Sequence, residues 1–159
     1  MMPSEQARVE LAVRNQAALD HLASDPEKYC EWIATIAFYK ALQVVEAVFT
    51  HDPDQQHGDN HGRRHGILKG KKCYSHIWKY YRPLWSASAI ARYLRAPEGP
   101  HFSSFSQYMA PDQVYPLLVG HYLHQVQMSA RQFLSEDAQK KLGLRVLSKT
   151  KKAGQRRKH

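Results

Sequence analysis

Two histidines and an arginine are spaced so that they could act together on a phosphate. His57, His61 and Arg64 lie in a polar segment between two apolar stretches of the chain. A histidine can take up or release a proton near neutral pH, and the guanidinium of an arginine can hold a phosphate through two parallel hydrogen bonds. Cleavage of RNA without a metal needs both functions. The segment is therefore our first candidate for a catalytic site, although the same residues could instead cap or pack against a helix end.

The same segment also fits a second chemistry, because its histidines recur every four residues. Imidazoles four apart on a helix can share one metal ion, and His57, His61 and His65 have this spacing. Gly58 and Gly62 oppose a regular helix there, and the chain has no H-E-x-x-H motif. We keep the metal site as the weaker hypothesis, and the principal hypothesis calls for no cofactor.

Basic residues alternate with aromatic residues directly after this segment. Lysines and arginines could contact phosphates while aromatic rings stack on bases, as in proteins that bind single-stranded nucleic acid. The basic candidates are Arg63, Lys69, Lys71, Lys72, Lys79 and Arg82. The aromatic residues Tyr74, Trp78 and Tyr81 follow helical core spacing, so the competing interpretation places the rings in the core and the lysines on a solvated face.

A long apolar helix precedes the polar segment and should position it. Residues 32–49 are apolar on almost every face, with only Lys40 and Glu46 interrupting, which is typical of a central core helix. The charges inside it and the polar sequence after it argue against a membrane span. We expect it to begin near Asp25 and Pro26, a good N-cap followed by a proline at the first helical position.

Helical periodicity and turn signals define the remaining elements. We expect helices over residues 4–23, 63–81, 84–94 and 112–134, and a short last helix from Ser135 to Gly143. Leu11 and Leu19 are expected on the buried face of the first helix. Pro83 should end the helix before it, and the regular part of the 112–134 helix should begin near Tyr115 because of Pro116. No run alternates at period two, so the fold class is all-α, an antiparallel four- to five-helix bundle.

The net charge of +9 is concentrated in two segments. Residues 61–82 and 145–159 each contain seven lysines and arginines, while all 14 acidic residues lie elsewhere. We expect one bundle domain over residues 1–144 and a basic, flexible tail over 145–159 that could bind RNA or a partner. Cys30 and Cys73 are expected to be buried free thiols, and the N-terminus has no apolar signal region, so we expect a cytoplasmic protein.

At this point the sequence resembles the HEPN-type (higher eukaryote and prokaryote nucleotide-binding) helical bundles. The resemblance rests on a core helix of the form E-W-x-x-x-x-A-F-Y-x-A-L-x-x-V-x-A from Glu31 to Ala47 and on the loop His57-x-x-x-His61-x-x-Arg64. An aromatic-rich helix from Ile67 to Tyr81 and the segment Ala91-Arg92-Tyr93 follow in the same order. The resemblance covers roughly residues 25–94.

The resemblance implies a bundle that often forms a homodimer. It also implies an RNA-associated role, in many relatives as a metal-independent endoribonuclease of a toxin–antitoxin or antiviral defence system, with RNA or an antitoxin as partner. That branch uses an arginine followed four to six residues later by a histidine, which makes Arg95 and His101 the second candidate pair. Other relatives are non-catalytic, and a scaffold of that kind would need an exposed apolar patch, for which Phe102, Phe105 and Met109 are candidates.

Overall fold

The computed structural model describes residues 2–54 and 60–147, and over these residues the chain is helical. The elements are α1 (Glu5–Leu22), α2 (Cys30–Phe49), α3 (His61–Gly70), η1 (Lys72–Tyr74), α4 (Ser75–Tyr93), α5 (Phe105–Tyr108), α6 (Pro111–Val114), η2 (Tyr115–Leu123), α7 (His124–Ala130), η3 (Arg131–Phe133) and α8 (Glu136–Lys141). In the described part of the chain the only β-type pairing is an isolated bridge between Arg95 and His101. The prediction of an all-α helical bundle is confirmed at this level.

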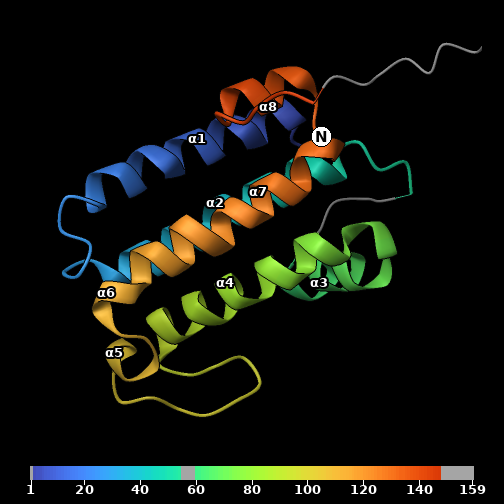
Figure 1. Cartoon of the computed structure of the whole chain (residues 1–159). Helices are drawn as coiled ribbons and strands as arrows, with labels where there is room; N and C mark the ends of the chain where they lie inside the picture. The colour runs from blue at the N-terminus through green and yellow to red at the C-terminus, as the bar shows by residue number, and fades with distance from the viewer. Residues whose placement is uncertain (1, 55–59, 148–159) are drawn as a thin grey trace, which may run out of the picture.

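The long helices form a bundle around α2, as Figure 1 shows. Helix α2 packs against α1 on one side and against α4, η2 and α7 on the others. Successive long segments run in opposite directions: α1 away from the N-terminus, α2 back, α4 away again, and the η2–α7 segment back. The short helix α8 lies on α1, and α3 lies beside α4.

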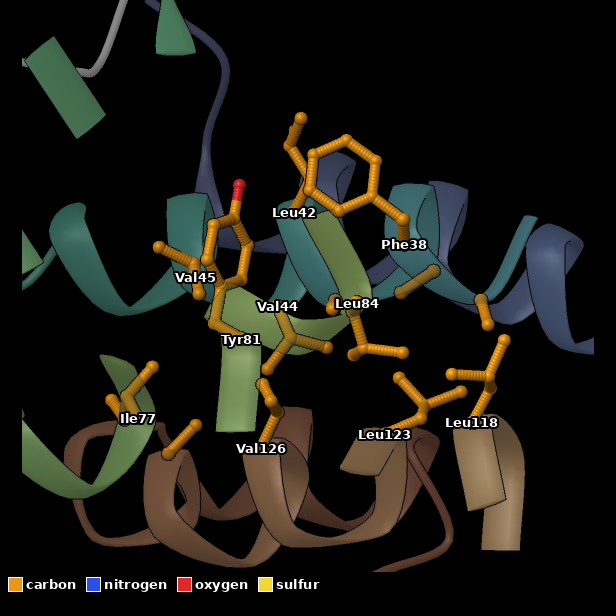
Figure 2. Packing of buried hydrophobic residues seen from close by; sticks show 14 of the residues in the cluster. Phe38, Leu42, Val44, Val45, Ile77, Tyr81, Leu84, Leu118, Leu123 and Val126 are labelled. Atoms are coloured by element: carbon orange, nitrogen blue, oxygen red, sulfur yellow. The ribbon is translucent and has the colours of Figure 1, made fainter. Parts of the chain in front are cut away.

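The core lies where α2, α4 and the η2–α7 segment face one another (Figure 2). Phe38 and Val44 of α2, Tyr81 and Leu84 of α4, and Leu118 of η2 are all fully buried. Burial of a side chain of this size stabilises a fold by roughly 1.5–3 kcal/mol. Helix α2 supplies the largest share of this core, as its apolar composition predicts.

Helix α2 begins four residues later than its capping signals predict. Residues Ala23 to Tyr29 form a chain of turns, in which the amide of Asp25 donates to Leu22 and the amide of Lys28 donates to Asp25. Asp25 therefore closes a turn and does not cap the helix. One edge of α2 also faces solvent, since Trp32 is 63% exposed and Tyr39 is 37% exposed.

The prediction that Pro83 ends a helix is wrong. Helix α4 continues through Pro83 to Tyr93, where Leu94 adopts a left-handed conformation with φ 53° and closes the helix. A proline inside a helix costs about 3 kcal/mol. The buried residues on both sides of it, from Ile77 to Ile90, offset that cost by packing on α2. The separate helices expected over 63–81 and 84–94 are therefore α3, a break at Lys71, and a single long α4.

Several predictions at the two ends of the chain are tested directly. Ser135 caps α8 by accepting from the amide of Ala138, and Gly143 follows with φ +71°, as expected. The 112–134 prediction corresponds to α6, η2, α7 and η3. The expectation that the regular part begins near Tyr115 is wrong, because Tyr115–Leu123, which contains Pro116, forms wide π turns and regular α-helix resumes at His124. Leu19 is buried as expected, but Leu11 is 42% exposed, because the buried face of α1 runs through Val9, Ala12 and Leu19.

Two expected surface properties are also corrected. Phe105 is 2% exposed and belongs to the core, so it cannot form an exposed patch with Phe102 and Met109, which are themselves partly buried. Cys30 is buried as expected, whereas Cys73 is exposed, because it lies on the outer side of η1.

Helix α2 is long and apolar enough to span a membrane by length and composition, but 72% of that window is buried inside the bundle. Burial of this extent is typical of the central helix of a bundle.

Candidate functional site

Helix α3 presents the histidine and arginine of the first candidate site. Asn60 caps it: its side-chain oxygen accepts from the amide of Arg63 at 2.9 Å, which satisfies one of the free amides of the first turn. The helix therefore begins at His61, two residues earlier than the sequence predicts. His57 lies outside the described residues.

Arg64 points into the protein. Its side chain is 7% exposed, and its Nε donates to Oε1 of the fully buried Glu46 at 2.7 Å. Arg8 of α1 adds a second guanidinium 3.9 Å from Oε2 of the same carboxylate. Glu46 thus ties α1 and α3 to the last turn of α2. Because its guanidinium is engaged in this cluster, Arg64 is placed to hold the fold and the neighbouring histidine, not to receive a phosphate from solvent.

The contact between Arg64 and His61 determines what His61 can offer. Nη1 of Arg64 lies 3.3 Å from Nδ1 of His61. A guanidinium can only donate, so Nδ1 accepts, and the proton of the neutral ring lies on Nε2. Burial, and then the charges of Arg64 and Arg92, lower the pKa of His61. At neutral pH His61 is therefore a hydrogen-bond donor with a fixed orientation.

His65 lies in an aromatic cluster and not at the surface. Its ring meets Trp85 edge-on at 4.2 Å between centroids, and Trp78 lies at 5.1 Å and Tyr81 at 5.7 Å. Burial, reinforced by the charges of His61, Arg64 and Lys69, lowers the pKa of His65 to about 4. His65 is thus neutral in the folded protein.

The metal hypothesis finds no complete ligand set among residues 2–54 and 60–147. No group of three or more histidine, cysteine or carboxylate side chains in that part of the chain is placed to hold one ion. The rings of His61 and His65 lie 6.1 Å apart between centroids, and His57, the third proposed ligand, falls outside the described residues.

A hollow of about 500 Å³ opens beside His61, and we call it the arginine groove. It combines two arginines with aromatic and small apolar side chains from α3, α4 and the segment after α4. The residues lining it are His61, Trp85, Ala89, Arg92, Tyr93, Arg95, Ala96 and Pro97.

Arg92 is held in a defined position within this groove. Its Nε donates to the carbonyl of Ser88 at 3.1 Å, and its Nη1 donates to the hydroxyl of Tyr39 at 3.2 Å. Its guanidinium carbon also lies 5.7 Å from the ring centre of Tyr39 and 5.1 Å from that of Tyr93. A fixed arginine beside exposed rings is suited to an anion with an attached aromatic group.

The second candidate pair, Arg95 and His101, is brought together. The chain reverses through residues 96–100, where the amide of Ala96 donates to the carbonyl of Pro100, and the amide of Phe102 donates to the carbonyl of Leu94 at 2.8 Å. Arg95 and His101 face each other in the resulting antiparallel bridge, and both are exposed. Arg95 also lines the arginine groove, as His61 does.

A second hollow of about 250 Å³, the tryptophan hollow, lies next to the first and shares Trp85, Ala96 and Pro97 with it. It adds two of the predicted basic residues, Lys69 and Arg82. The ammonium of Lys69 lies 5.0 Å from the ring centre of Trp78. The full lining is Lys69, Trp78, Arg82, Trp85, Ser86, Ala96, Pro97, Glu98 and Gly99.

The other predicted basic residues lie elsewhere. Lys71 donates to both oxygens of Asp52 at 2.8 Å and so fixes the end of α2 to the segment before η1. Lys79 lies over the ring of Tyr80, which faces His121. Arg63 and Lys72 are exposed but line neither hollow.

Of the aromatic residues at these hollows, the sequence pattern singled out Trp78 but not Trp85 or Tyr93, although a periodic signal marks Trp85. Trp78, Arg82, Trp85, Ala89 and Arg92 are spaced four or three residues apart and therefore share one face of α4. The five residues lie on both sides of Pro83. A predicted helix end at Pro83 therefore divides them between two helices, and the shared face is not recognised.

A comparison with protein families, curated proteins and solved structures gave no match for this chain. Functional inference therefore rests on the residues and their arrangement.

Proposed function

We propose that this protein is an RNA-associated helical bundle that holds a single-stranded segment across the arginine groove and the tryptophan hollow. The observation that carries the proposal is the stripe Trp78, Arg82, Trp85, Ala89 and Arg92 along one face of α4. It places cations and aromatic rings alternately along one face of the helix.

This alternation suits the chemistry of single-stranded nucleic acid. Arg92, Arg95 and the Nε2 proton of His61 can hold phosphate oxygens, and the faces of Trp85 and Tyr93 can stack on bases. Tyr93 is 69% exposed, so its ring is open to a ligand. Stacking on an aromatic side chain contributes roughly 1–3 kcal/mol per base. The HEPN resemblance adds an independent reason to choose RNA, and with it the proposal of a toxin–antitoxin or antiviral role.

Binding of a fluorescently labelled single-stranded RNA, followed by anisotropy over a range of salt concentrations, tests this proposal. Arg95→Gln should weaken binding and flatten the salt dependence by about 0.7 in the logarithmic slope, the value for one phosphate contact on a single strand. The matched control is Arg14→Gln, which removes an exposed arginine from α1, on the other side of α2 (Figure 1). Equal effects of the two variants would contradict a site at the groove.

Metal-independent RNA cleavage is the second candidate, and the opposed pair Arg95 and His101 favours it. His101 would move protons at the 2′-hydroxyl and the leaving oxygen, while Arg95 would hold the phosphate, giving a cyclic phosphate product. In this scheme Arg64 is a positioning residue, because it is buried against Glu46 and orients His61. His61 would donate a hydrogen bond from its Nε2 to a phosphate oxygen, since its Nδ1 already accepts from Arg64.

Incubation of RNA with the purified protein in EDTA tests the second candidate. Cleavage by the wild type and not by His101→Ala, with binding retained in that variant, would support it. Cleavage that persists in both His101→Ala and Arg95→Ala would exclude this pair. RNA binding without any cleavage would leave the protein as a non-catalytic RNA-associated module.

A further inference from the structure

Lys40 is a buried amine that the proposed RNA site does not use. It lies in the middle of α2 and is 3% exposed. Its Nζ donates to Oε1 of Gln16 at 2.7 Å, a neutral amide from α1. The same amide donates through its Nε2 to Asp20 at 2.7 Å, so Gln16 stands between the amine and the acid.

Such surroundings favour the neutral form of the amine. Within the described residues no carboxylate lies within ion-pair distance of Lys40. Burial lowers the pKa of Lys40 to about 8, and the more distant charge of Asp20 opposes this shift only in part. Near neutral pH a substantial fraction of the amine therefore carries a free electron pair, which makes a lysine a nucleophile.

The amine also has space beside it. A hollow of about 200 Å³, the lysine hollow, opens between α1, α2 and α8 and is lined by Val13, Gln16, Ala17, Asp20, Lys40, Lys141 and Leu142. One water occupies about 30 Å³ in the liquid, so the hollow has room for a molecule of roughly six heavy atoms. Lys141, whose side chain is 40% exposed and is paired with Asp137, adds a second cation to the lining.

We propose that Lys40 binds small 2-oxo acids as Schiff bases in the lysine hollow, with Lys141 holding their carboxylate. The pair between Lys141 and Asp137 is exposed and spans one helical turn, so it is weak enough to be exchanged for a ligand. The volume of the hollow admits a small carbonyl compound, and Lys141 in its lining favours one that carries a carboxylate.

The reaction balances without any further reagent. The nitrogen of Lys40 attacks the carbonyl carbon and forms a carbon–nitrogen bond. The neutral amine releases two protons, the carbonyl oxygen takes up two, and that oxygen leaves as water. The product is an imine, and water reverses the reaction.

Reductive trapping with pyruvate tests the proposal on the full-length protein. Pyruvate and cyanoborohydride are added at pH 7.5, and the modified lysines are located by peptide mass spectrometry. Lys40 should be modified at least about 10-fold faster than the exposed Lys28, because burial lowers the pKa of Lys40 to about 8 and leaves part of its amine unprotonated at this pH. Modification of Lys40 no faster than that of Lys28 would overturn the proposal.

Three variants separate the elements of the proposal. Lys40→Met should lose the adduct while keeping its helical circular dichroism, since an apolar side chain of similar length replaces a buried charge. Gln16→Glu keeps the lysine but places a carboxylate against it, which should raise the pKa of Lys40 and slow trapping about 10-fold.

Lys141→Gln should slow trapping of pyruvate and leave trapping of formaldehyde, which has no carboxylate, unchanged. Equal trapping of pyruvate by Lys141→Gln and the wild type would overturn the assignment to 2-oxo acids.

Discussion

The guanidinium of Arg64 lies 2.7 Å from the carboxylate of Glu46, and both side chains are buried. This pair joins the first turn of α3 to the last turn of α2, and the two residues are 18 apart in the sequence. It also fixes His61, because the same guanidinium contacts Nδ1 of that ring. The position of the arginine groove therefore depends on an ion pair in the interior.

Removal of one partner of this pair should be strongly destabilising. Arg64→Met leaves the buried Glu46 without its shorter contact, and the loss of a partner of a buried charge costs about 3–5 kcal/mol. Arg8→Met is the matched control and should cost less, since Arg8 is 3.9 Å from Glu46 and its side chain is 19% exposed. Urea unfolding measures the free energy of unfolding of both variants. A larger decrease for Arg8→Met than for Arg64→Met would contradict this ranking.

The buried His65 should make folding sensitive to mild acid. Burial lowers its pKa in the folded protein to about 4, from the ordinary value of 6.5. The unfolded chain therefore binds a proton first as the pH falls. The stabilisation by neutral His65 is fully present above pH 6.5 and is lost progressively between about pH 6.5 and 4. The shift corresponds to roughly 3 kcal/mol as an upper bound.

Unfolding free energies measured from pH 7.5 to 4.5 check this expectation. The lowered pKa values of Glu5 and Asp52 affect stability mainly below this window, because their ordinary values are 4.5 and 3.8. His65→Phe keeps an aromatic ring in the cluster without a titrating group, so its stability should fall less over the same range. Identical pH profiles for the wild type and His65→Phe would refute the assignment.

Two lysines separated by one residue should differ in their effect on RNA binding. Lys69 lines the tryptophan hollow beside Trp78, whereas the ammonium of Lys71 is held by Asp52. Lys69→Gln should weaken RNA binding and reduce its salt dependence, and Lys71→Gln should mainly lower the melting temperature. Anisotropy titrations and thermal melts of the two charge-matched variants give both readings. The reverse order of binding losses would exclude the tryptophan hollow as part of the site.

The two thiols should react at different rates. Cys73 is exposed, while Cys30 is buried and burial raises the pKa of its thiol, which lowers its nucleophilicity. A chromogenic disulfide reagent should therefore modify one thiol rapidly in the folded protein and both after denaturation. Fast reaction of two thiols before unfolding would show that Cys30 is accessible.

The sequence predicts the core of this fold better than its functional surface. Apolar periodicity is strong in α2, so its central position follows from composition alone. The helix end predicted at Pro83 is wrong because the packing of α4 on α2 offsets the local cost of the proline. This tertiary packing cannot be read from the local sequence. The error conceals the stripe from Trp78 to Arg92, since the stripe is continuous only when α4 is a single helix.

The roles of individual charges are also decided by tertiary contacts. Arg64 and Lys71 read from the sequence as phosphate ligands, yet their partners Glu46 and Asp52 come from α2 and from the residues after it. Arg95 and His101 are separated by a proline-rich loop in the sequence, and the hydrogen-bonded turn over residues 96–100 brings them opposite each other. Sequence spacing can suggest which charged residues form a site. It does not show which of them already pair with a carboxylate elsewhere in the fold.

Crosslinking of RNA to the protein tests the central claim most directly. A single-stranded RNA containing a photoreactive base is irradiated with the full-length protein, and the crosslinked peptides are identified by mass spectrometry. The account predicts crosslinks to Trp85 and Tyr93 and their loss on competition with unlabelled single strands. Crosslinks confined to other parts of the protein, with none on α4 or on residues 94–99, would contradict a nucleic-acid site at the arginine groove.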